Sequence, residues 1–199
     1  PLTLTLVASD GETGLGQTLY QWPGQAPTVY TQPLLLRREG QTTLTWFAQD
    51  RALNQEAPQT YTLALDWTPP LLTATVQGQA IAPGWVRPGA TLVVSATDAG
   101  AGVAALDYAV GNGAWQPYRG PLPPTTGGAY AYRFRARDQA GNATLTTLTL
   151  GIDTQPPTTT LHLTPPSTAA GWHTQPVTVT LVATDSGSGL FQTQVRWAD

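Results

Sequence analysis

An interval of about 88 residues recurs along the chain and constrains its fold more than any other feature. Asp10, Asp98 and Asp185 follow one another at intervals of 88 and 87 residues, each after an alternating apolar run. The proline-rich segments 66–70 ("DWTPP") and 153–157 ("DTQPP") keep the same interval. Coincident landmarks at one spacing indicate tandem duplication of a single structural unit.

The Pro-Pro segments give the expected domain bounds. We expect residues 1–70, the first repeat, to lack its first strand, and residues 71–157, the middle repeat, to be complete. Residues 158–199, the third repeat, hold the first strands (A, B and C) of a further copy. Because partial repeats leave sheet edges and core faces exposed, we expect a longer array or completion by another chain.

Alternation of apolar and polar residues marks the strands of the middle repeat, and no stretch has helical spacing. About seven short strands without a helix predict an all-β fold of tandem seven-stranded immunoglobulin-like or fibronectin type III-like β-sandwiches joined by Pro-Pro linkers. The side chains expected to point inward are Leu72, Ala74, Val76, Leu92, Val94, Ala96, Leu106, Tyr108, Val110, Tyr130, Tyr132, Phe134, Ala136, Leu148, Leu150 and Ile152.

Composition excludes several classes of site and partner. The 199 residues include no cysteine, which excludes disulfides, zinc-thiolate sites and cysteine nucleophiles. The formal charge of -3 gives no general attraction to nucleic acid or to an anionic membrane. No apolar run approaches the roughly 20 residues that span a bilayer, so we expect no membrane insertion by this segment.

Several motifs carry a family resemblance: "GW" before the second strand, "ATDAGAGV" at 96–103, "GAWQPYRGP" at 113–121 and "ARDQAGN" at 136–142. Together they resemble bacterial immunoglobulin-like tandem repeats of secreted and cell-surface proteins, including a group named after a leptospiral outer-membrane protein. The first repeat departs from the pattern with "AQDRALN" at 48–54. The resemblance implies a spacer or adhesion role outside the cell.

Three aspartates are candidate metal ligands. The loops after the second and sixth strands of a sandwich return to the pole where the linker enters, which brings Asp98 and Asp138 toward Asp66. Calcium is coordinated by six to eight oxygens, and such carboxylates with loop carbonyls could supply them. The alternative is that each aspartate accepts hydrogen bonds from turn amides in its own loop. The sequence leaves both uses open.

Two aromatic residues are candidate ligand-binding side chains. Trp115 and Tyr118 lie beside a predicted hairpin, where they could stack on a sugar ring or cover the edge of the sandwich core. Trp85 and Trp172, in the repeated Gly-Trp dipeptides, are expected to be core residues.

Catalytic signals are weak, and we expect no enzymatic activity. His162 and His173 have no serine or second histidine at a triad-like or metal-ligand spacing. The sequence therefore predicts a structural or adhesive module of a bacterial extracellular or cell-surface protein, acting as a spacer, stalk or filament-forming unit. Its expected partners are neighbouring repeats, other copies of the protein and cell-surface polysaccharide. The alternative is a carbohydrate-binding accessory domain of a secreted hydrolase.

Overall fold

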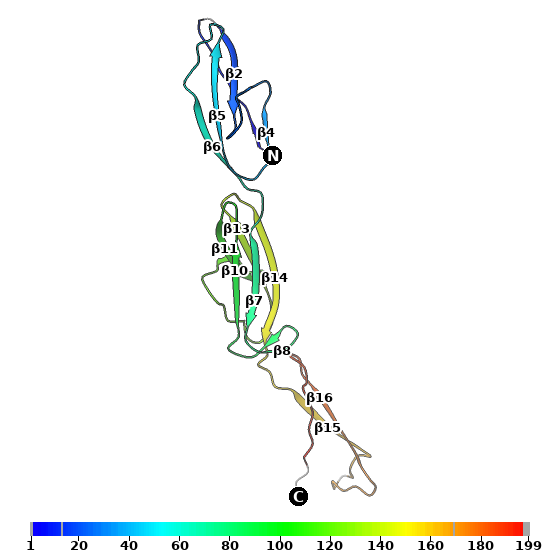
Figure 1. Cartoon of the computed structure of the whole chain (residues 1–199). Coiled ribbons are helices and arrows are strands. Elements are labelled where there is room, and N and C mark those ends of the chain that lie inside the picture. The colour runs from blue at the N-terminus through cyan, green and yellow to red at the C-terminus, as the bar shows by residue number, and fades with distance from the viewer. Residues whose placement is uncertain (1, 13, 169, 197–199) are drawn as a thin grey trace. The chain divides into compact units, whose positions relative to one another are not determined.

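The computed structural model describes residues 2–12, 14–168 and 170–196, and these residues form strands, turns and loops (Figure 1). No helix in this part of the chain is long and apolar enough to cross a membrane. Pro1 and residues 197–199, at the outer bounds of the first and third repeats, lie outside the described residues.

Sixteen strands are formed in the described part of the chain. Those of the first repeat are β1 (Leu2–Leu4), β2 (Leu15–Gln21), β3 (Thr28–Val29), β4 (Leu34–Leu36), β5 (Gly40–Asp50) and β6 (Gln59–Leu65). Those of the middle repeat are β7 (Leu71–Gln77), β8 (Ala80–Ala82), β9 (Trp85–Val86), β10 (Thr91–Thr97), β11 (Val103–Val110), β12 (Gln116–Pro117), β13 (Gly128–Asp138) and β14 (Ala143–Ile152). Those of the third repeat are β15 (Thr158–Thr164) and β16 (Thr178–Thr184).

The chain divides into two compact units. Unit 1 holds the chain as far as Leu71, together with Thr97–Ala104 and Arg137–Thr144. Unit 2 holds Leu72–Ala96, Ala105–Ala136 and the chain from Leu145 on. The linker aspartate Asp66 and the loops that follow β10 and β13 therefore belong to one unit.

The middle repeat is a β-sandwich, which confirms the predicted fold class. One sheet has the strand order β12-β11-β13-β14-β9-β8, and β7 pairs with β10 in the other. Alternation places one face of each strand inside, where Leu72, Ala74 and Val76 of β7 pack against the core. Tyr130 differs from the prediction, because 37% of its surface is exposed. The buried core cluster consists of Val86, Ala90, Leu92, Val94, Tyr132, Phe134, Leu150 and Ile152.

The first repeat has the same strand pairing, displaced by 88 residues. Equivalent Cα partners are Leu19↔Val29 and Asp107↔Pro117, Tyr20↔Thr28 and Tyr108↔Gln116, and Leu4↔Leu34 and Leu92↔Leu122. Strands β5 and β13 both have 11 residues and start 88 residues apart. The buried hydrophobic residues found in the described part of this repeat are Leu44 and Leu63. The pairing pattern is thus shared, whereas the size of the core is not.

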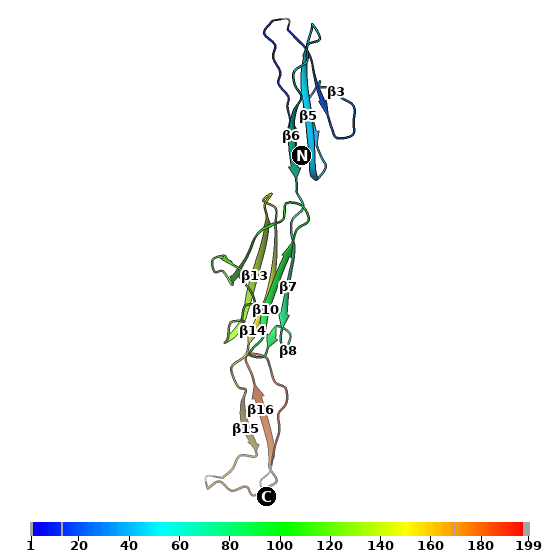
Figure 2. The same cartoon turned by 60° about the vertical axis from the view of Figure 1, so that its left-hand side comes forward.

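The third repeat contributes a two-stranded antiparallel ladder, which Figure 2 shows as β15 beside β16. Every residue of β15 is exposed. The expected third strand is not formed in residues 190–196. Trp172 is 76% exposed, so the prediction that it is a core residue is wrong. No strand described for this repeat lies opposite the β15–β16 ladder to bury its apolar side chains.

Candidate functional site

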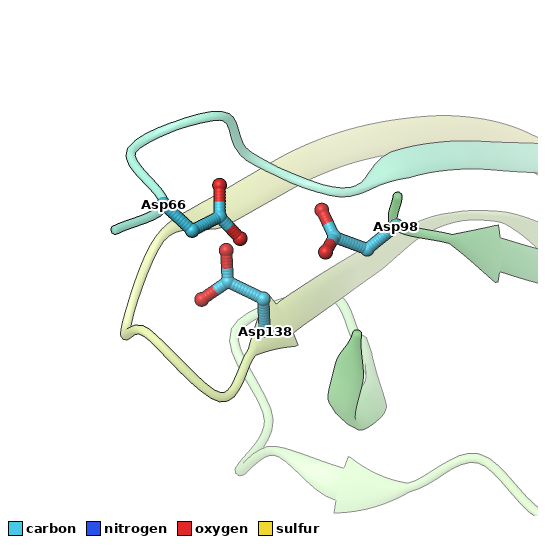
Figure 3. A group of neighbouring side chains, drawn as sticks. All are labelled: Asp66, Asp98 and Asp138. Carbon is cyan, nitrogen blue, oxygen red and sulfur yellow. The ribbon is translucent and has the colours of Figure 1, made fainter. Parts of the chain in front are cut away.

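The three aspartates proposed from the sequence lie together. Asp66 is in the linker after β6, Asp98 directly follows β10, and Asp138 ends β13. Carboxylate oxygens of all three lie within 4.8 Å of one another. Figure 3 shows the three side chains pointing toward a common centre. The linker enters the middle repeat at the pole where β10 and β13 end, and this brings the three carboxylates together.

Asp98 closes the loop between β10 and β11. Its Oδ1 accepts hydrogen bonds from the amides of Gly100 at 3.1 Å and Gly102 at 2.7 Å. Such Asx bonding is favoured where a short carboxylate side chain precedes a tight turn. Equivalent bonds run from Gly187 and Gly189 to Asp185, at 3.0 and 2.8 Å, and from Gly14 to Asp10, at 2.7 Å.

Asp138 closes the loop between β13 and β14 and is only 4% exposed. Its carboxylate accepts bonds from the amide and the side-chain Nδ2 of Asn142, both at 2.8 Å. Burial raises the pKa of Asp138. Hydrogen bonds from the Asn142 side chain and from the amides of Asn142, Gly141 and Ala140 lower the pKa by more than burial raises it, so the pKa lies below the ordinary 3.8. The carboxylate is therefore held in its charged form.

The first repeat makes the same loop with a different residue at its tightest position. Asp50 accepts the amide and Nδ2 of Asn54, both at 2.7 Å. Leu53 has a φ of 72°, where the middle repeat has Gly141 at 96°. A side chain with a Cβ is strained in this left-handed region. The departure from "ARDQAGN" to "AQDRALN" therefore keeps the loop and adds strain.

Asp66 joins the linker to the β10–β11 loop. Its Oδ2 accepts the Ala101 amide at 2.5 Å, and its Oδ1 accepts the amide of Thr68 at 3.0 Å. Its backbone carbonyl accepts Nδ2 of Asn142 at 3.2 Å. A Cβ on Gly100 would overlap the Asp66 carboxylate, so a larger residue there would displace the carboxylate from its hydrogen bonds. These contacts lie within unit 1.

Asp153 repeats this arrangement within unit 2. Its Oδ2 accepts the amide of Ser188 at 2.6 Å and the Ser188 hydroxyl at 2.8 Å, and its Oδ1 accepts the amide of Gln155 at 2.9 Å. A Cβ on Gly187 would overlap its carboxylate. The amides of Ser188 and Gln155 and the Ser188 hydroxyl lower the pKa of Asp153 by more than burial raises it.

The Asp66–Asp98–Asp138 cluster has the geometry for two kinds of chemistry. Two oxygens that bind one calcium ion, each about 2.4 Å from it, lie at most about 5 Å apart, and the spacing here meets that limit. At least five of the six carboxylate oxygens already accept hydrogen bonds from the chain. The structure therefore contains the turn bonding foreseen as the alternative, while calcium binding stays a prediction.

Trp115 lies over two guanidinium groups on the outer face of the sandwich. The Cζ atoms of Arg133 and Arg135 are 5.2 and 4.6 Å from its ring centroid. Arg135 also pairs with Asp107 at 2.8 Å, and Asp107 is only 8% exposed. This stack combines cation–π attraction with a partly buried ion pair. The signal in the sequence for this stack is the alternation of Arg133, Arg135 and Arg137 along β13.

Tyr118 is half-buried and packs against the core cluster of the middle repeat. Its hydroxyl accepts the Val94 amide at 3.0 Å. Tyr118 thus covers the edge of the core, one of the two roles considered for it. Sugar stacking by Trp115 and Tyr118 stays a prediction.

No model of a protein family matches the chain. No curated protein matches it either. Among solved structures, the chain is similar to fibronectin(III)-like modules of Clostridium thermocellum CbhA, with 9% identity and a TM-score of 0.38. The similarity covers 73% of this chain and 82% of the other.

Proposed function

We propose that the chain is a structural spacer of tandem β-sandwich repeats in a bacterial extracellular or cell-surface protein, with the domain bounds given by its Pro-Pro segments. The observation that supports this function is the bonding of the linker carboxylates. Asp66 and Asp153 lie 87 residues apart, and each accepts a hydrogen bond from a backbone amide in the next repeat. The donors are Ala101, in the loop after β10, and Ser188, in the loop after β16. A bond that recurs at successive linkers serves the joint rather than a single ligand site.

The chemistry of the linker suits a joint that resists bending. The two prolines after each aspartate have fixed φ angles and donate no backbone hydrogen bond. The aspartate supplies a charged acceptor, and such bonds contribute about 1.5–3 kcal/mol each. Gly100 and Gly187 let the loop backbone approach the carboxylate. Together these features limit the conformations of the linker.

Hydrogen exchange tests the bond. Asp66→Ala is expected to speed exchange of the Ala101 amide roughly 10–100-fold, because the charged acceptor is lost. The Ser188 amide, which bonds to Asp153, is an internal control whose exchange should stay unchanged. Equal exchange of Ala101 in both proteins would contradict the role of Asp66.

Spin labels test the stiffness of the joint. The chain contains no cysteine, so Thr60→Cys and Thr147→Cys, both at exposed positions, take labels selectively. We expect a narrow distribution of label distances, which broadens in Asp66→Ala and stays narrow in the control variant Glu12→Ala. A distribution already as broad with Asp66 intact would reject the spacer with stiff joints.

A further inference from the structure

The middle repeat has a hollow of about 480 Å³ at one edge of its sandwich. Its lining comes from β11, β12 and the segment 119–122 that follows β12. All of these residues belong to unit 2, so the hollow is complete within one compact unit. A concave site with apolar walls and a few polar groups is typical of small-molecule binding.

Backbone hydrogen bonds fix the segment that closes the hollow. At one end, the Tyr118 amide donates to the Leu106 carbonyl of β11 at 2.8 Å. At the other end, Leu122 and Leu92 of β10 exchange both backbone bonds, at 2.7 and 3.0 Å. The segment therefore spans from one sheet to the other, and Pro121 restricts its backbone further. A wall held in this way is preorganised, which lowers the entropic cost of ligand binding.

The apolar part of the lining is an aromatic ring with two prolines, Pro117 and Pro121. The ring is that of Tyr108, which is half-buried, packs against the core cluster and lines the hollow. Its contact with the core holds the ring in place. An aromatic face fixed in this way is suited to pack against the C–H groups of a sugar ring.

Two polar side chains of the lining have donors that the chain does not use. Gln116 is exposed, and its Oε1 accepts the Tyr108 hydroxyl at 3.2 Å, which leaves both hydrogens of Nε2 for a ligand. Arg119 is exposed and forms no hydrogen bond or ion pair with the described residues, whereas Arg135 is paired with Asp107. The guanidinium of Arg119 matches a carboxylate in two parallel hydrogen bonds.

The first repeat lacks these two donors. The residues 88 positions before Gln116 and Arg119 are threonines, whereas the tyrosine of the hollow has an equivalent in Tyr20. The ring is thus shared by both repeats, and the amide and the guanidinium belong to the middle repeat. Packing of the repeat accounts for the ring but gives no reason for the added donors.

We propose that this hollow binds a carboxylated sugar, such as a uronic acid residue of a polysaccharide. The Tyr108 ring packs against the sugar ring, Nε2 of Gln116 donates to its hydroxyl groups, and Arg119 binds its carboxylate. The combination selects this class, because a neutral sugar leaves the guanidinium without an acceptor and a simple carboxylate leaves the ring without a contact. The inference goes beyond the spacer function and does not depend on the linker bonds.

Titration of the isotope-labelled chain, followed by amide NMR, tests the site. The probes are trigalacturonate, its methyl ester and sodium acetate. We expect trigalacturonate to shift the amide signals of Gln116, Arg119 and Gly120, and to bind about tenfold or more tightly than either other probe. Equal affinity for the ester removes the role of the charge, and equal affinity for acetate removes the role of the sugar ring. Either result, or the absence of shifts with trigalacturonate, overturns the proposal.

A matched pair of variants separates the site from net charge. Arg119→Gln is expected to weaken trigalacturonate binding about fivefold or more. The control Arg87→Gln removes the same charge from another exposed arginine of the middle repeat, outside the lining of the hollow. Both side chains are exposed, so both variants should keep the circular dichroism of the parent. Equal weakening in the two variants would overturn the site and would leave the spin-label test of the spacer unaffected.

Discussion

The first and middle repeats have the same strand register but differ in what they bury. The middle repeat encloses a cluster of eight buried residues, whereas the buried hydrophobic residues described in the first repeat are Leu44 and Leu63. Register depends on alternation and turns within β2 to β6, and the middle repeat has the equivalents of these strands in β11 to β14. The core depends in addition on the β7–β9 segment, for which the described part of the first repeat holds no equivalent. The comparison separates the determinants of pairing from those of stability.

Substitution of equivalent aromatic residues gives the largest expected difference. Phe134 is fully buried, so Phe134→Ala should lower the free energy of unfolding by about 3–5 kcal/mol. Its equivalent, Trp46, is half-buried, so Trp46→Ala should lower it by about 1–2 kcal/mol. Urea unfolding followed by circular dichroism measures both. Equal losses would show that the first repeat has a core as complete as that of the middle repeat.

The loop after β5 has Leu53 where the equivalent loop after β13 has Gly141, and the two residues can be exchanged by mutation. Leu53→Gly removes the strain of a φ of 72° at a side chain that is 74% exposed, so we expect a gain of about 1 kcal/mol. Gly141→Leu should cost a similar amount in the middle repeat. Thermal melting of the two single variants and of the double variant measures the effects. A loss of stability in Leu53→Gly would contradict the strain.

Acid should destabilise the loop closed by Asp138 and the contact made by Asp153 alike. The pKa values of Asp138 and Asp153 are lowered in the folded protein, so the unfolded chain binds more protons at pH values just below about 4. The stabilisation is complete above the ordinary pKa of 3.8 and is lost as the pH falls through the folded values. Urea midpoints between pH 7 and 2.5 should show this decline, and it should be smaller in Asp138→Asn.

Calcium should have the smallest effect. Because amides already occupy most of the carboxylate oxygens of Asp66, Asp98 and Asp138, we expect melting temperatures with calcium and with a chelator to agree within about 1 °C. Stabilisation by calcium that disappears in Asp98→Asn would instead assign a metal to the cluster.

The sequence predicted those features that depend on local periodicity. Alternation alone identified the inward faces of β7 and β10, because side chains of a strand point to opposite faces in turn. Sandwich topology predicted the aspartate cluster, because the loops after the second and sixth strands return to the pole where the linker enters. The position of Asp66 in the linker predicts its place in the cluster but not its bond to the Ala101 amide.

Other features depend on contacts that periodicity does not encode. Asp107 lies on the face of β11 expected to meet solvent, yet it is buried because Arg135 binds it and Trp115 lies over Arg135. Leu53 gave no turn signal because leucine rarely has a positive φ. The exposure of Trp172 depends on which strands lie opposite its hairpin rather than on its own motif.

The pairing of Asp66 with Gly100, and of Asp153 with Gly187, has a consequence for gene duplication and shuffling. Each carboxylate stands at the end of one repeat and the glycine that admits it stands in the next, so compatibility is encoded across the boundary. A recombined array keeps this joint where the preceding repeat ends in the aspartate and the following repeat has the glycine. A substitution on one side of a repeat boundary therefore has to be compatible with the residue on the other side.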